Sequence, residues 1–221
     1  GRQDMQQSCV AAIRSRVILL MIPLLLIGCS SNTTPGATIP SLNSDSPGSS
    51  TAQSARAQSA SSSGAVTPDS LSDPSVSYTV TEIPDGLNEV ESEVLKAAIS
   101  YDIAGWSAYR SMNGDLSRIE ATTSGEELTQ IKEIYKKYSD ASQHDAGDGK
   151  TGVLSVDVPP ARDTATVAVC QDQTTMQLLS ASGEDQTPDS MKHRFNALYI
   201  LTNQSGKWTV SKTSITGIDQ C

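Results

Sequence analysis

The spacing of hydrophobic and polar positions changes once along the C-terminal part of the chain, from a helical period to a strand period. From Glu89 to Met112, apolar or small residues recur every three or four positions, which is typical of an amphipathic helix. A short helical turn is expected at residues 116–119. Ser124 and Glu127 then have the spacing of a capping box. We therefore predict a second long helix that begins there and ends near Ser139.

After residue 150 apolar and polar residues alternate, which indicates strands. Five strands are expected, at residues 152–158, 165–170, 176–178, 195–202 and 208–215, with the fourth buried on both faces. Ser205 and Gly206 suit a hairpin between the last two strands. Residues 143–150 contain two glycines and three charged residues, so we predict a loop there. Helices followed by strands predict an α+β domain with helices packed on one side of a curved antiparallel sheet.

The chain before this region lacks the residues that build a core. The nine aromatic residues, two Trp, six Tyr and one Phe, all lie within residues 78–208. Residues 30–75 are almost wholly Ser, Thr, Ala, Pro, Gly and Gln, and such a stretch buries too little apolar surface to offset its ordering entropy. We therefore expect one folded domain at 76–221 behind a disordered tether at 29–75. The tether's composition also permits O-glycosylation.

The N-terminus has the pattern of an export signal. Arginines at positions 14 and 16 precede the apolar stretch Val17–Ile27, which is too short to span a membrane as a helix but suits a signal-peptide core. The stretch ends in Leu-Ile-Gly-Cys at residues 26–29, which resembles the lipobox of bacterial lipoproteins. An ordinary signal peptide with a chance cysteine is the alternative.

The lipobox resemblance implies that residues 1–28 are a signal peptide, with a short extension ahead of Met5. It further implies that Cys29 carries fatty acyl chains, which anchor the protein in the cell membrane on the extracytoplasmic side.

Cysteine usage then leaves one pair for the domain. Cys9 lies in the segment that the signal peptidase would discard, and Cys29 would carry the lipid, so Cys170 and Cys221 remain. An oxidising location lets a disulfide persist, and closing a loop of about fifty residues contributes roughly 4 kcal/mol in the chain-entropy model. We predict this disulfide, which would hold the chain end against a strand.

Charge and histidine content narrow the range of partners. The net charge of -9 argues against nucleic acid as a partner, and solubility outside the cell accounts for the acidity. His144 and His193 have no companions at metal-ligand spacing, so we predict neither a metal nor a cofactor. Residues Gly147–Lys150 lack the spacing of a phosphate-binding loop. The basic cluster Lys192–Arg194 could dock an acidic partner, although a solvated strand start explains it as well.

The order of elements resembles the cone-shaped fold of nuclear transport factor 2 and ketosteroid isomerase. More narrowly, the strand Ala165–Asp172 and the closing strand Gly206–Val210, which leads to Cys221, resemble small secreted or lipid-anchored proteins of actinobacteria. The resemblance covers residues 88–221. It implies a cavity between sheet and helices, which Tyr109, Met112 and Phe195 could line.

Enzymes of this fold often place an Asp, Tyr or His inside the open end of the cone for acid–base chemistry. Tyr101, Asp102 and Asp172 are the nearest candidates for such chemistry. No paired acid-and-phenol motif can be matched residue by residue, so we expect Tyr101 to pack in the core and Asp102 to point to solvent.

These observations lead to three hypotheses about function, each of a different class. The leading hypothesis is a non-enzymatic interaction module that binds an envelope protein or a cell-wall component, because the chain combines a lipid anchor and a long tether with no catalytic motif. The second is a carrier of a small apolar or lipidic ligand, and the third is an enzyme of isomerase or hydratase type. A homodimer through the sheet, which relatives of this fold often form, stays open.

Overall fold

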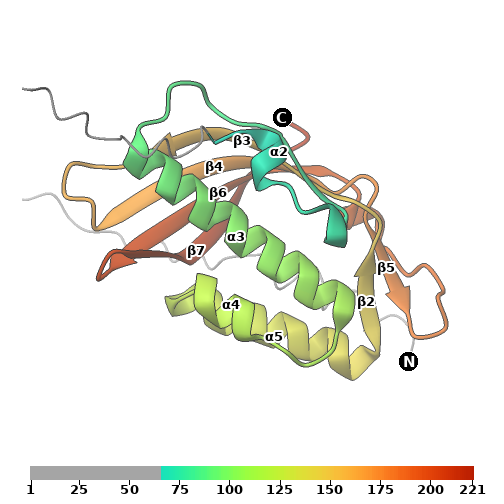
Figure 1. The fold of residues 1–221 in the computed structure, drawn as a ribbon. Coiled ribbons are helices and arrows are strands. Elements are labelled where there is room, and N and C mark those ends of the chain that lie inside the picture. Colours follow the sequence, from blue (N-terminus) through green and yellow to red (C-terminus); the bar gives the residue numbers. More distant parts are fainter. Residues whose placement is uncertain (1–65) are drawn as a thin grey trace, which may run out of the picture. The chain divides into compact units, whose positions relative to one another are not determined.

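The computed structural model describes residues 66–221, which form helices on one side of a twisted sheet (Figure 1). The elements are α2 (Pro68–Leu71), the 3-10 turn η1 (Pro74–Val76), β1 (Tyr78–Glu82), α3 (Glu89–Ser111), α4 (Ser117–Thr122), α5 (Gly125–Ala141), β2 (Gln143–Ala146), β3 (Gly149–Asp157), β4 (Thr164–Asp172), β5 (Gln177–Ser180), the 3-10 turn η2 (Asp189–Met191), β6 (Arg194–Gln204) and β7 (Lys207–Ile218). The expected signal peptide, Cys29 and residues 29–65 of the expected tether lie outside the described residues.

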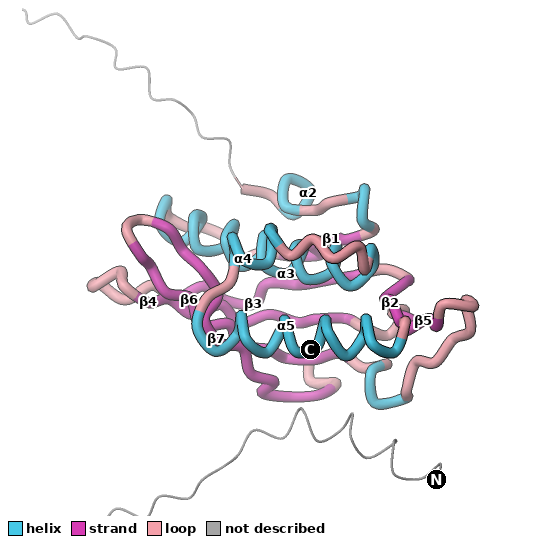
Figure 2. Tube along the Cα trace, turned by 90° about the horizontal axis from the view of Figure 1, so that it is seen from below, coloured by secondary structure: helices cyan, strands magenta, loops and turns pink. Residues whose placement is uncertain are grey.

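The main sheet has the strand order β1-β3-β4-β6-β7, and β2 pairs with β5 in a separate two-stranded sheet. All neighbours are antiparallel except β1, which runs parallel to β3 at one edge. Figure 1 shows α3 crossing the strands of this sheet on one face, and Figure 2 shows the same arrangement from below. α3 contacts β3, β4, β6 and β7. The predicted α+β class is therefore confirmed, and the sheet is mixed because β1, which the periodicity analysis missed, joins it.

The helices agree with their predicted positions. α3 ends one residue earlier than predicted, because Met112 adopts a left-handed conformation with φ 44° and closes the helix. The short helix α4 is confirmed, and α5 runs two residues beyond the predicted end. The predicted capping box is wrong: the Ser124 side chain does not cap α5, and its hydroxyl accepts a hydrogen bond from the Thr209 hydroxyl of β7 (2.9 Å).

The predicted loop at 143–150 is also wrong. Its first half is β2, which pairs antiparallel with β5 so that Gln143 lies opposite Ser180, and β3 begins at Gly149. A strand that pairs with a segment more than thirty residues away leaves no signal in its own composition. The glycines mark the corner between the two strands.

Two strands bury different faces from those predicted. Leu154 is 43% exposed because a bulge between Val153 and Ser155 shifts the alternation by one residue. β6 is buried on one face only, where Tyr199 and Leu201 point toward the helices, while residues such as Leu198 on its other face are half-buried. The helices of the described part pack on the inner face of this sheet, so the outer face keeps partial contact with solvent.

The structure describes ten residues ahead of the expected domain boundary at residue 76, and they contain ordered elements. Thr67 caps α2 through a reciprocal capping box with Ser70, and Leu71 is buried in the main core. The Ser72 hydroxyl accepts the backbone N–H of Val80 (2.9 Å), which ties this segment to β1. Polar composition therefore hid a short ordered segment that packs against α3 and β1.

The predicted disulfide between Cys170 and Cys221 is confirmed, with the two Cα atoms 5.9 Å apart. It joins the end of the described chain to β4. The neighbouring Arg194 donates to the carbonyl of Cys221 (3.0 Å), and its own carbonyl accepts the backbone N–H of Asp219 (2.7 Å). The C-terminal segment is thus held by one covalent bond and several hydrogen bonds.

Candidate functional site

The most unusual feature of the interior is a carboxyl group in the middle of α3. Asp102 is only 8% exposed, which contradicts the expectation that it points to solvent. Its Oδ1 accepts hydrogen bonds from the Tyr199 hydroxyl (2.5 Å) and the Gln171 amide (3.4 Å). Its Oδ2 accepts from the Tyr78 hydroxyl (2.8 Å) and the Thr151 hydroxyl (3.1 Å). We call these five residues, which come from α3 and four strands, the acid–phenol cluster.

Burial sets the protonation of this cluster. Desolvation raises the pKa of Asp102 from its ordinary value, although the hydrogen bonds from its four donors act in the opposite direction. Burial, and then the charge of Asp102, raise the pKa of Tyr78 and of Tyr199 well above 10. Both phenols therefore keep their protons and serve as hydrogen-bond donors.

A second buried carboxylate, on α5, is linked to the acid–phenol cluster through a tyrosine. Glu127 of α5 accepts the hydroxyl of Tyr101 (2.6 Å) and the hydroxyl of Thr213 (2.9 Å). The Tyr101 ring meets Tyr199 edge-on, with centroids 5.3 Å apart. Tyr101 thus packs against the core as expected, and it links Glu127 to the acid–phenol cluster.

Sequence reasoning assigned Glu127 to a helix cap and so missed its interior position. One signal could have found it: Glu127 stands four residues before the buried Ile131, on the apolar stripe of its helix. A charged residue on such a stripe is buried only when partners from other elements satisfy it.

The geometry of the acid–phenol cluster favours a structural role over a catalytic one. A general base needs a free oxygen within hydrogen-bond reach of a substrate, and both oxygens of Asp102 are already bonded. Two grooves on the described surface are lined by other residues: one lies between α2 and α3, and the other lies near the ends of α3 and α5. The cluster therefore stabilises contacts between α3 and the sheet.

The other residues singled out from the sequence do not gather around one cavity. The Tyr109 hydroxyl donates to the carbonyl of Ile131 (3.2 Å), and Met112 packs in the same small core between α3, α4 and α5. Phe195 is buried on β6, edge-on to His193. Of the three expected lining residues, only Met112 lines one of the two grooves.

Asp172 stands apart from Asp102, at the end of β4. Partial burial acts to raise the pKa of Asp172, but hydrogen bonds from Thr174 and Arg194 outweigh it and lower this pKa. His193 pairs with Asp219 (2.7 Å). Two members of the basic cluster at 192–194 are therefore already paired with carboxylates, since Arg194 also pairs with Asp172 (3.3 Å).

A further buried carboxyl group lies on β2, in the segment that the sequence predicted to be a loop. Asp145 is 4% exposed, and its Oδ1 has no hydrogen-bond partner among the described residues. Burial raises the pKa of Asp145 to about 7, and the charge of Arg110 counteracts this only in part. Arg110 itself donates to the Gly147 carbonyl (2.6 Å) and lies over the Trp106 ring.

Within residues 66–221, no group of three or more His, Cys, Asp or Glu side chains could hold a metal ion. No helix of that same stretch is long and apolar enough to cross a membrane.

Comparisons with known proteins concern the fold alone. No protein-family model and no curated protein matches the chain. Among solved structures, the intermembrane space region of the chloroplast protein ARC6 is 11% identical, with a TM-score of 0.46, and the match covers 59% of this chain and 97% of that one. An NTF-2-like protein of unknown function from Silicibacter pomeroyi is 16% identical, with a TM-score of 0.34 and coverage of 57% and 93%.

A protein of unknown function with a cystatin-like fold from Nostoc punctiforme is 11% identical, with a TM-score of 0.34 and coverage of 61% and 95%. These proteins share the general arrangement of helices on a mostly antiparallel sheet. Similarity at this level carries no argument about activity.

Proposed function

We propose that this chain is a lipid-anchored, extracytoplasmic domain that binds another component of the bacterial cell envelope through its surface and catalyses no reaction. The acid–phenol cluster is the observation that carries the non-catalytic part of the proposal. Asp102 occupies the place where a reactive acid would be sought, and its two oxygens accept four hydrogen bonds from the surrounding strands.

The filled interior also argues against a carrier function. A ligand that entered between α3 and the sheet would separate Asp102 from Tyr78 and Tyr199. Leaving a buried donor or acceptor unpaired costs about 1–3 kcal/mol for each group. Recognition at the surface requires no such rearrangement.

Export and anchoring rest on the N-terminal pattern that ends at Cys29. The disulfide between Cys170 and Cys221 supports the same location, because such bonds persist in oxidising compartments and are rare in the cytosol. A tether between the lipid and the domain would let the domain reach partners away from the membrane surface.

The anchoring can be tested with a Cys29→Ala variant in the protein's own host. We expect the wild-type chain to incorporate labelled palmitate and to sediment with membranes, and the variant to do neither. Palmitate in the Cys29→Ala variant, or an unlabelled wild-type chain, would contradict the anchor.

The interaction can be tested by cross-linking in intact cells, followed by identification of the captured components. We expect one envelope component to recur with the wild-type chain and to be lost when Cys29→Ala removes the anchor. Capture of random abundant proteins alone would contradict an interaction module. Native mass spectrometry of the chain from its host tests the carrier hypothesis separately, because an apolar or lipidic ligand lost on denaturation would support a carrier instead.

A further inference from the structure

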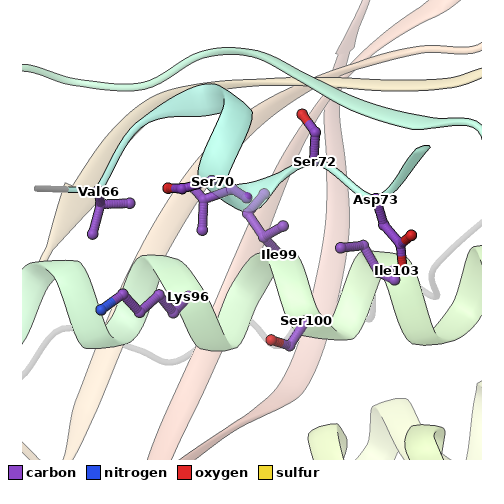
Figure 3. Close-up of a pocket in the computed structure, with 9 residues that line it drawn as sticks. Val66, Ser70, Ser72, Asp73, Lys96, Ile99, Ser100 and Ile103 are labelled. Carbon is purple, nitrogen blue, oxygen red and sulfur yellow. The ribbon is translucent and has the colours of Figure 1, made fainter. Parts of the chain in front are cut away.

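A groove of about 630 Å³ lies between the N-terminal segment α2–η1 and helix α3 (Figure 3). Its floor is apolar and consists of Leu71, Ile99 and Ile103, all of them buried. This volume lies within the range of small-ligand sites. No residue of the acid–phenol cluster lines the groove, so a ligand there would leave the interior intact.

Three polar groups along the groove have no partner within the described part of the chain. The ammonium of Lys96 forms no ion pair or hydrogen bond with residues 66–221, and the same holds for the hydroxyl of Ser100. Asp73 uses Oδ1 to accept the backbone N–H (3.1 Å) and the hydroxyl (2.5 Å) of Ser75, which leaves its Oδ2 without a partner there.

These groups follow one another in the order positive, neutral, negative. In Figure 3 Lys96 lies at one end of the groove and Asp73 at the other, beside Ile103, with Ser100 between them on α3. From Lys96 to Ile103 the helix advances about 10 Å, at 1.5 Å per residue. An extended peptide advances about 3.3–3.6 Å per residue, so three residues cover the same span.

We propose that the groove binds a short peptide of about three residues that has a free carboxyl terminus and a free amino terminus. The α-carboxylate pairs with Lys96, the α-ammonium pairs with Asp73, and the Ser100 hydroxyl bonds a peptide group between them. Small apolar side chains of the peptide rest on the floor. The proposal deepens the proposed function, on which it rests, by naming the chemistry of the envelope component that is bound.

The two opposite charges decide between classes of ligand. An anionic lipid or an acidic chain would satisfy Lys96 but be repelled by Asp73 and by the acidic domain. A purely cationic ligand would leave Lys96 unused. A zwitterion of this length satisfies both groups at once.

The test uses the full chain in detergent micelles, labelled with nitrogen-15 and titrated with the tripeptide Ala-Ala-Ala. N-acetylated, C-amidated and doubly blocked forms of the same peptide serve as comparisons. We expect shifts of the backbone amides of Asp73, Lys96 and Ser100, and an affinity about fivefold lower when either terminus is blocked. Absent shifts in the groove, or equal affinity for free and blocked peptides, would overturn the proposal.

Two conservative variants assign each terminus to its partner. Lys96→Gln should bind the free acid and the amide equally, and Asp73→Asn should bind the free amine and the acetylated form equally. Asn retains the side-chain oxygen that caps η1, so the segment should stay folded. Lys207→Gln, in the distant β6–β7 hairpin, is the matched control and should discriminate as the wild type does. If both groove variants still distinguished free from blocked peptide termini as strongly as the wild type does, the assignment would be refuted.

The outcome can be separated from that of the proposed function. A recurrent envelope component captured in cells, together with no peptide binding, overturns the groove assignment alone. Peptide binding without any recurrent component overturns the proposed interaction instead. If the groove amides shift with protein concentration in the absence of peptide, the groove binds a second copy of the chain, and the peptide assignment is wrong.

Discussion

At the scale of single residues, two buried aspartates have similar burial but different partners. Asp102 accepts four hydrogen bonds from surrounding strands, whereas Asp145 has one oxygen with no partner among the described residues. Burial raises the pKa of both carboxyl groups, but only Asp102 has donors on both of its oxygens. Because of this difference in partners, replacement by Asn should affect stability in opposite directions at the two sites.

Asp145→Asn should increase the stability of the fold at neutral and alkaline pH. The pKa of Asp145 is about 7 in the folded chain against an ordinary 3.8, so the folded state binds the proton more tightly than the unfolded state does. Stability therefore falls as pH rises from about 4 to 7, by roughly 4 kcal/mol at most for this group, and then levels off. The variant should show a smaller fall between pH 4.5 and 8 in urea unfolding. An unchanged pH profile would contradict the assignment.

Asp102→Asn should destabilise the fold by about 1–3 kcal/mol. In the wild type both oxygens of Asp102 accept hydrogen bonds, whereas the amide nitrogen of Asn is a donor and would leave some of the surrounding donors unpaired. Urea unfolding at pH 7 measures the difference. Asp145→Asn is the control, since it makes the same chemical change at a carboxyl oxygen without donors. Equal effects of the two variants would show that the hydrogen bonds of the acid–phenol cluster add nothing.

At the scale of elements, contacts from other parts of the chain modify what each segment's own pattern indicates. Ser124 bonds Thr209 instead of capping its helix. β7 carries two bulges, where the hydroxyls of Ser211 and Thr216 donate to carbonyls of β6 (3.1 and 3.2 Å). Bulges at an edge strand hinder pairing with another chain. The corner between β2 and β3 likewise depends on contacts from another part of the chain, because the backbone of Thr175 packs closely against Gly147.

Gly147→Ala should destabilise the β2–β3 corner by more than its backbone conformation alone requires. Gly147 has φ +84°, and an added Cβ would lie 2.2 Å from the Thr175 carbonyl oxygen. Gly206 in the β6–β7 hairpin has the same φ, but nothing lies within 4 Å of its added Cβ. We expect a loss of about 1 kcal/mol for Gly206→Ala and about 2–3 kcal/mol for Gly147→Ala in chemical unfolding. Equal losses would rule out the steric term.

At the scale of the whole molecule, the disulfide connects the end of the chain to the middle of the main sheet. Cys170 lies on β4, and the 51-residue separation from Cys221 spans β5, β6 and β7. In the unfolded chain the bond therefore closes a loop that contains the residues of these three strands. Arg194 and Asp219 hold the same segment by hydrogen bonds in the folded chain.

Replacing both cysteines by serine should lower stability by about 4 kcal/mol in the chain-entropy model, which corresponds to roughly 10 °C in Tm for a domain of this size. The far-ultraviolet circular dichroism should stay unchanged, because the local hydrogen bonds still position the C-terminal segment. The wild-type chain treated with a reductant should match the double variant. A Tm that is insensitive to both changes would show that the bond adds no stability.

The sequence by itself determined the features that depend on neighbours along the chain. Its periodicity predicted α3, α5, β4 and the β6–β7 hairpin, and counting cysteines left one pair for the disulfide. A helical or strand period is a property of a few consecutive residues, so it can be read without knowing the fold. The α+β class followed from the order of those elements.

Only the tertiary structure decided which polar residues lie inside. One hydroxyl that bonds Asp102 belongs to Tyr199, 97 residues further along the chain, and one of the two hydroxyls that bond Glu127 belongs to Thr213 of β7, 86 residues away. The pairing of β2 with β5 and the addition of β1 to the sheet are equally remote from any local pattern. Burial of a charged group is favourable only when such distant partners compensate its desolvation. The positions of these partners are set by the packing of the whole chain, so they cannot be read from the local sequence.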